Sequence, residues 1–96
     1  MKRKEIENMF DTVDYSQIQR YTDGYPGKFM TLEQIKPGQQ FYFLDGPDKN
    51  IKDWYEIVEF EYDWRYQSWI VVLWNNETER FTRMQKRDVY MTGRID

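Results

Sequence analysis

Residues 54–64 read WYEIVEFEYDW, and this stretch decides the fold class of the chain. Apolar and acidic side chains alternate along it with the period of a β-strand that has two unlike faces. The alternation places the even-numbered residues on a buried face and the odd-numbered residues, with Glu59, Glu61 and Asp63 among them, on an acidic face. We therefore predict one long strand that is buried on one side.

Further strands are predicted on both sides of this stretch. Residues 39–44 alternate in the same way and run into the turn sequence of residues 45–48. Residues 68–74 are apolar on both faces, which is typical of a central strand, and Asn75-Asn76 suit a tight hairpin. Three short elements complete the series: a strand from Phe81, a helical turn over 85–88 and a last strand over 89–91.

The first third of the chain carries helix signals instead. Ile6, Met9, Phe10 and Val13 have the spacing of one helical stripe, which predicts a helix over residues 3–13. A short turn is expected to begin with Ser16 as its N-cap, and Thr31 with Gln34 has the spacing of a capping box. We divide the chain into an N-terminal helical arm and loop, residues 1–30, and a β domain, residues 31–96.

The predicted fold class is mainly β, of the α+β kind: an antiparallel barrel of four to five strands with the helical arm at its N-terminus. The segment IKPGQQFYF, residues 35–43, followed by Gly46, resembles the opening of SH3-like and KOW-like small barrels. The resemblance covers about residues 31–92 and implies an SH3-like barrel. KOW domains carry a further glycine after the first hairpin, and residues 50–55 have none, so only the fold is carried over. One-domain chains of this pattern are also similar in style to accessory proteins of phages and mobile elements, which implies a viral accessory protein that regulates or inhibits a host protein.

Composition excludes several classes of chemistry. The 96 residues include no cysteine and no histidine, which removes disulfides, thiol nucleophiles and the most common zinc ligands. The longest apolar run, residues 69–74, is far shorter than the about twenty residues of a membrane span. The basic N-terminus lacks the apolar region of a secretory signal. We expect a cytoplasmic, non-enzymatic protein without cofactor, metal or membrane partner.

Acidic residues offer two weak sites. Glu59, Glu61 and Asp63 alternate along one strand face, where an open sheet surface keeps carboxylates solvated, so a solubilising role is favoured over acid–base catalysis. Four oxygen-bearing residues gather near the turn at 45–48 without the order of ligands in an EF-hand, so turn formation is favoured over calcium binding. These residues are Asp45, Asp48, Asn50 and Asp53.

Aromatic residues provide the main functional signal. The chain holds four tryptophans, eight tyrosines and six phenylalanines, which a core of this size cannot all bury. Tyrosine, tryptophan and arginine dominate the hot spots of protein interfaces. We predict that Tyr62, Trp64, Arg65 and Tyr66, at a hairpin tip, contact a protein partner or a second copy of the chain, with Trp54 and Tyr55 as a second candidate pair. The alternative to a contact site is a purely structural role, in which Trp64 folds back onto the sheet and covers it.

A basic segment supports an alternative function. Arg80, Arg83, Lys86 and Arg87 lie near aromatic residues, and single-stranded nucleic acids bind where cations and stacking rings combine. The net charge of -3 and the pI near 5.0 argue against a dedicated nucleic-acid binder. The competing interpretation is that these cations pair with the acidic strand across the sheet.

Overall fold

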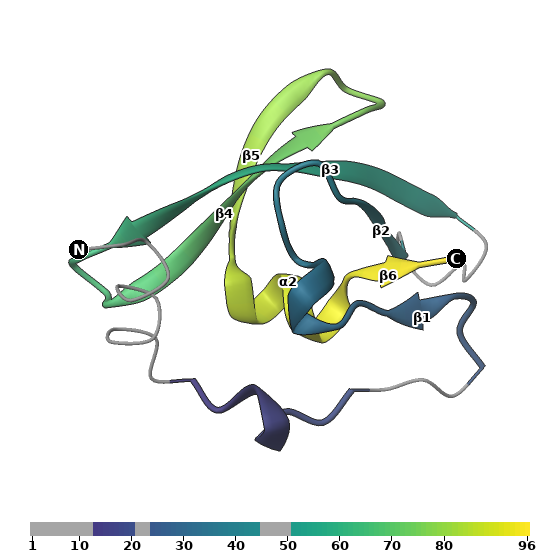
Figure 1. Ribbon diagram of the computed structural model, residues 1–96. Helices are drawn as coiled ribbons and strands as arrows, with labels where there is room; N and C mark the ends of the chain where they lie inside the picture. Colours follow the sequence, from purple (N-terminus) through teal and green to yellow (C-terminus); the bar gives the residue numbers. More distant parts are fainter. Residues whose placement is uncertain (1–12, 21–23, 45–50) are drawn as a thin grey trace.

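Six strands form one antiparallel sheet in the computed structural model, which describes residues 13–20, 24–44 and 51–96. Their order in the sheet is β1-β6-β2-β3-β4-β5 (Figure 1). The strands are β1 Lys28–Phe29, β2 Gln40–Leu44, β3 Lys52–Asp63, β4 Ser68–Asn75, β5 Arg80–Gln85 and β6 Arg94–Ile95. Three helices accompany them in this part of the chain: the 3₁₀-helices η1 Tyr15–Gln17 and η2 Leu32–Gln34, and the α-helix α2 Lys86–Thr92.

The mainly-β class is confirmed, whereas the expected SH3-like barrel of four to five strands is wrong, because the six described strands form one sheet that does not close into a barrel. Among the described residues, β1 and β5 are the two edges of the sheet and do not pair with each other. Closing a sheet requires strands long enough to tilt and stagger against one another, and β1 and β6 have two residues each. Helix α2 follows β5 directly and contacts β4, β5 and β1, so it fills the space in which closure would occur.

The long strand β3 contains a β-bulge that changes its faces. Ile57 pairs with Leu73 and Glu59 with Val72, so Val58 is the additional residue. A bulge shifts the alternation by one position. Before the bulge the odd-numbered Ile57 is buried, and after it the even-numbered Phe60 packs against the core. The predicted uniform alternation over 54–64 is therefore wrong for the N-terminal half of β3.

The C-terminal helix is longer than predicted. Helix α2 covers Lys86–Thr92 and includes residues 89–91, which were expected to form a strand. Val89 and Tyr90 are buried, and with Lys86 they have the three- and four-residue spacing of one helix face. The last strand is β6, after Gly93, and it pairs with β1 and β2.

The turns at the N-terminal side differ in part from expectation. Asp14, and not Ser16, caps η1: its Oδ1 accepts hydrogen bonds from the Ser16 amide at 3.1 Å and from the Ser16 hydroxyl at 2.6 Å. The capping box before η2 is confirmed, because the Gln34 side chain accepts from the Thr31 amide at 2.9 Å. The predicted helix over 3–13, apart from Val13, and the turn at 45–48 lie outside the described residues.

The core lies between one face of the sheet and the helices that cover it (Figure 1). Tyr15 of η1 and Tyr90 of α2 meet there edge to face, with ring centroids 5.0 Å apart. The fully buried members of this core are Met30, Phe41, Ile57, Val71, Leu73 and Val89. The opposite face, which we call the outer face, carries Tyr42, Trp54, Val72, Trp74 and Phe81, as the strand register shows.

Candidate functional site

The turn between β3 and β4 is the hairpin tip that the sequence predicts as a contact site. Residues 64–67 connect the two strands, and the Asp63 side chain accepts hydrogen bonds from the Arg65 amide at 3.0 Å and the Tyr66 amide at 3.4 Å. Gln67 completes the turn with a φ of 51°, a left-handed conformation that costs a non-glycine residue energy. Asp63 therefore acts as a turn former, which explains one of the acidic residues without any catalytic role.

Two rings of the tip are strongly exposed. Trp64 keeps 65% and Tyr66 67% of their surface accessible. Trp64 also meets Tyr62 edge to face at 4.6 Å between ring centroids, and Tyr62 meets the buried Trp69 in the same way at 5.0 Å. Trp64 therefore rests on a ring anchored in the sheet and still presents most of its surface to solvent.

The tip also carries charge and a hollow. The Arg65 guanidinium lies 5.0 Å from the centre of the Tyr66 ring, within the range of a cation–π contact. A surface hollow of about 370 Å³ adjoins the tip, and Glu61, Ile70 and Arg83 form part of its lining. We call Tyr62, Trp64, Arg65 and Tyr66 the tip cluster.

The second candidate pair is divided between the two faces of the sheet. Trp54 lies on the outer face against Tyr42, with ring centroids 4.9 Å apart. Tyr55 lies on the core face, where it stacks on Phe41 at 6.0 Å and donates a hydrogen bond to Asp53 at 2.9 Å. Because about 25 Å of strand separates this pair from the tip cluster, the structure does not unite the two candidates.

The basic residues of the alternative function do not form one surface stripe. Arg83 forms an ion pair with Glu61 of β3 at 3.0 Å, as expected if these cations neutralise the acidic strand. Lys86 lies over the rings of Tyr15 and Phe60, at 5.5 and 5.7 Å. Arg80 begins β5 and Arg87 lies in α2, and both are exposed. These residues are therefore near one another in the sequence, but in the structure they make different contacts.

Glu61 and Asp53, like Asp63, make structural contacts, and no contact of this kind with the described residues is found for Glu59. Glu61 pairs with Arg83, and Asp53 accepts hydrogen bonds from Tyr55 and, at 3.3 Å, from the Asn75 side chain. Asp45, Asp48 and Asn50 lie outside the described residues. In the ranges that the structure describes, no three acidic side chains are grouped so that they could hold a metal ion, and none of the helices there is long and apolar enough to cross a membrane.

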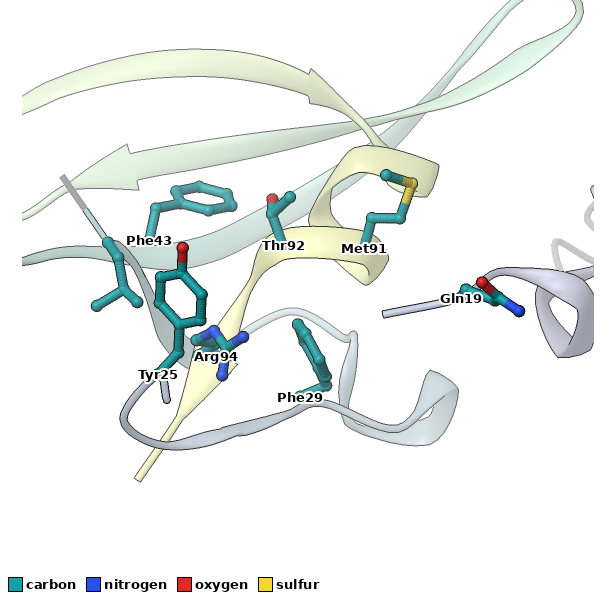
Figure 2. Close-up of a pocket in the computed structure, with 8 residues that line it drawn as sticks. Gln19, Tyr25, Phe29, Phe43, Met91, Thr92 and Arg94 are labelled. Atoms are coloured by element: carbon teal, nitrogen blue, oxygen red, sulfur yellow. The ribbon is translucent and has the colours of Figure 1, made fainter. Parts of the chain in front are cut away.

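A pocket between β1, β2 and the end of α2 was not predicted from the sequence. It has a volume of about 470 Å³, and Figure 2 shows the Arg94 guanidinium between the rings of Tyr25 and Phe29. The guanidinium lies 4.2 Å from the centre of the Phe29 ring and 5.3 Å from that of Tyr25, and it donates to the Pro26 carbonyl at 3.3 Å. Arg94 is buried, so these contacts hold the short strands β1 and β6 together.

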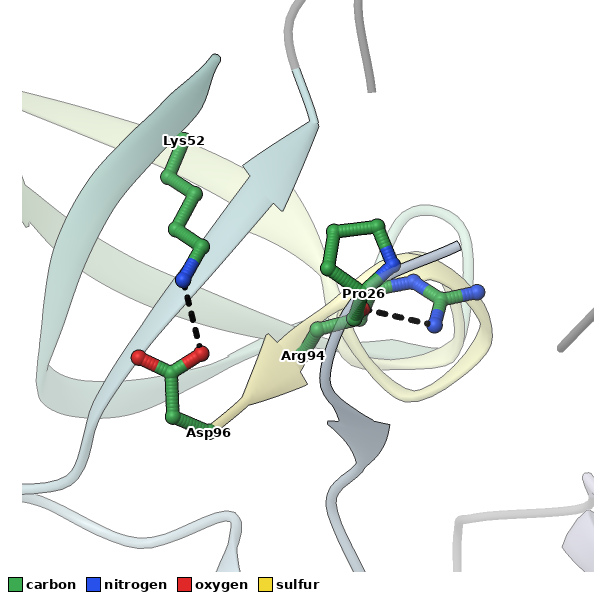
Figure 3. A network of polar contacts seen from close by, with 4 residues as sticks. All are labelled: Pro26, Lys52, Arg94 and Asp96. Atoms are coloured by element: carbon green, nitrogen blue, oxygen red, sulfur yellow. Dashed lines mark hydrogen bonds and ion pairs between the residues drawn. The ribbon is translucent and has the colours of Figure 1, made fainter. Parts of the chain in front are cut away.

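The C-terminal residue is tied to the start of β3. Figure 3 shows the Lys52 ammonium donating to the Asp96 carboxylate, at 2.9 Å. This hydrogen bond lowers the pKa of Asp96 and raises that of Lys52. Burial raises the pKa of the nearby Tyr42 hydroxyl, and the negative charge of Asp96 raises it further. The network fixes β6 in the sheet.

Strand β5 of the β4–β5 hairpin presents another exposed ring, which was not predicted as a site from the sequence. Phe81 keeps 62% of its surface accessible and meets Trp74 edge to face at 4.7 Å. The hairpin register could have indicated this pair, because a turn centred on residues 77–78 places residue 74 opposite residue 81.

Comparisons with protein-family models, with curated proteins and with solved structures find no match to this chain.

Proposed function

We propose that this chain is a non-enzymatic binding module that contacts a protein partner through the tip cluster. The observation that carries the proposal is the exposure of Trp64 and Tyr66, at 65% and 67%, on one four-residue turn. Burying the exposed part of a ring as large as that of Trp64 removes about 100–150 Å² from water, or about 3 kcal/mol. Two such rings supply the apolar centre of an interface.

The order within the turn supports the same function. The Asp63 side chain fixes the turn backbone by accepting hydrogen bonds from two amide groups, and the Tyr62 ring contacts the Trp64 ring edge to face. Rings held in one arrangement before binding lose less conformational entropy when they meet a partner. The neighbouring Glu61 and Arg83 provide a polar rim around the hollow, the usual surrounding of an apolar hot spot.

The test begins with capture of partners on the immobilised chain from a lysate of the native host and their identification by mass spectrometry. The affinity of each purified partner is then measured for the wild type and for the Trp64→Ala, Tyr66→Ala double variant. We expect a loss of at least about 30-fold, because a hot-spot residue contributes about 2 kcal/mol or more.

The matched control replaces two exposed aliphatic residues away from the tip, Leu32→Ala with Ile51→Ala, and is expected to bind as the wild type does. Sedimentation of the same proteins shows whether the partner is a second copy of the chain. Equal affinity of the tip variant and the wild type for every partner, with the fold intact, would contradict the proposal.

A further inference from the structure

The two edges of the sheet differ in length. Strand β5 runs over Arg80–Gln85 and pairs on one side with β4, and no other strand of the described residues pairs with it. Strand β1, at the opposite edge, has two residues. Alternate residues of an edge strand direct their N–H and C=O groups away from the sheet. Strand β5 therefore presents a row of hydrogen-bonding groups long enough to receive another strand.

Strand β5 also lacks two features that interrupt edge pairing. Its register with β4 is continuous from Gln85 opposite Ile70 to Arg80 opposite Asn75, so no bulge bends it, and it contains no proline. None of its residues is buried. Bulges, prolines and short length are common means by which proteins block the pairing of unused edges. Strand β5 has none of these three, and only its charged side chains oppose such pairing.

The charge of this edge selects the kind of partner. Strand β5 carries two cations, Arg80 and Arg83, and no acidic residue; Lys86 and Arg87 follow it in α2, and Glu61 of β3 pairs with Arg83. Pairing of β5 with the β5 of a second copy brings two sets of cations together, and like charges in cross-strand positions are destabilising. An acidic strand is stabilised in the same position, because its carboxylates lie beside the arginines.

We propose that β5 accepts an acidic, extended segment of a protein partner as an additional strand of the sheet. Phe81 and Arg83 both lie on the outer face, two positions apart. The segment that fits carries an apolar residue opposite Phe81, where Trp74 enlarges the apolar surface, and a carboxylate opposite Arg83. Arg83 also lines the hollow beside the tip cluster, whereas Arg80 and Phe81 lie toward the far end of β4, and the proposal does not depend on the role proposed for the tip.

The test uses three synthetic peptides as probes and the full chain, labelled for amide NMR. The first peptide alternates glutamate and valine over the length of β5, the second replaces glutamate by lysine, and the third is the acidic peptide with N-methylated alternate amides. The acidic peptide is expected to shift the amide signals of β5 in a saturable manner. The other two are expected to bind at least about tenfold more weakly, because they lose the charge pairs or the backbone hydrogen bonds.

Charge variants provide the second arm of the test. Arg80→Glu, which leaves Arg83 and the hollow beside the tip unchanged, is expected to weaken binding of the acidic peptide by at least about tenfold, whereas the control Lys36→Glu, on a lysine outside β5, leaves it unchanged. The spectrum of each free variant reports whether the fold is intact.

Three results of the peptide titrations would overturn the proposal: shifts confined to residues outside β5, equal binding of the N-methylated peptide, or no saturable shift. Dimerisation of the free chain through β5 would also overturn it. The Trp64→Ala, Tyr66→Ala variant is expected to bind the peptide normally, so failure of the tip proposal and failure of this one remain distinguishable.

Discussion

Replacement of Gly27 by alanine tests how tightly the β1–β6 end of the sheet is packed. Gly27 has a φ of +76°, and a Cβ atom there would overlap the Tyr42 hydroxyl and lie 2.7 Å from the Ile95 carbonyl oxygen. Gly38 is a matched control, because its φ is +93° and nothing lies within 4 Å of its Cβ position. The two substitutions share the backbone strain and differ in the steric overlap.

The expected magnitudes follow from this difference. An alanine in the left-handed region costs about 1–2 kcal/mol, which is the whole expected cost of Gly38→Ala. Overpacking adds about 1–3 kcal/mol at Gly27, so Gly27→Ala is expected to lower the free energy of unfolding by about 2–5 kcal/mol. Removal of the hydroxyl with Tyr42→Phe is expected to recover part of the additional cost.

Urea unfolding followed by tryptophan fluorescence measures both variants, alone and in the Tyr42→Phe background. The slope of the transition must stay constant for the comparison to report stability. If Gly27→Ala costs no more than Gly38→Ala, the close approach of Tyr42 to Gly27 is wrong, and so is the account of how β6 is fixed in the sheet.

Four further predictions concern the tip, the outer face, the bulge and the basic segment. The Trp64→Ala, Tyr66→Ala variant is expected to keep its free energy of unfolding within about 0.5 kcal/mol because both rings are exposed, whereas Ile57→Ala, in the core, is expected to lose about 2–5 kcal/mol in the same urea assay. The raised pKa of Tyr42 means that its neutral hydroxyl stabilises the folded state, and this contribution to stability is complete below the ordinary pKa of 10.0 and is lost as the pH rises through the raised pKa. Ultraviolet titration should show that Tyr42 ionises at higher pH than an ordinary tyrosine, and Asp96→Asn should lower the pH at which it ionises. Deletion of Val58 is expected to give a folded protein with Ile57 and Phe60 still in the core, as amide NMR can show, and an unfolded product would refute the assigned bulge. A gel shift with single-stranded oligonucleotides is expected to show no complex at low salt, whereas a complex that dissociates as salt rises would favour the function based on Arg80, Arg83, Lys86 and Arg87.

The faces of β3 show where sequence reasoning succeeds and where it fails. Alternation correctly predicts a strand, because period two is a property of the extended backbone. A single alternation over 54–64 places Glu56 on the buried face, which is an unfavourable position for a carboxylate. With Val58 as an additional residue, Glu56, Glu59 and Glu61 share the outer face. The conflict at Glu56 was the available signal for the bulge.

Other errors arise from contacts that are remote in sequence. Residues 89–91 have the apolar character of a short strand, and their helical state depends on burial of Val89 and Tyr90 in the core beneath the sheet. Closure of the barrel could not be decided from strand signals either, because it depends on the two-residue lengths of β1 and β6. The position of the tip was predictable, since a short turn between two long strands has no core position to fill.

The described rings with the greatest accessibility lie at the two ends of the central strand β4. Trp64 and Tyr66 lie on the turn before it, and Phe81 lies opposite Trp74 near its other end. The eight residues of β4 span about 25 Å, so one small side chain or loop of a partner cannot reach both surfaces. A single partner that engages both gains from effective concentration, and a variant of either surface then weakens binding by far more than the direct interactions of that surface account for. Two separate partners leave the effects of the tip variant and the β5 variant independent, and measurement of both variants against each partner distinguishes the two arrangements.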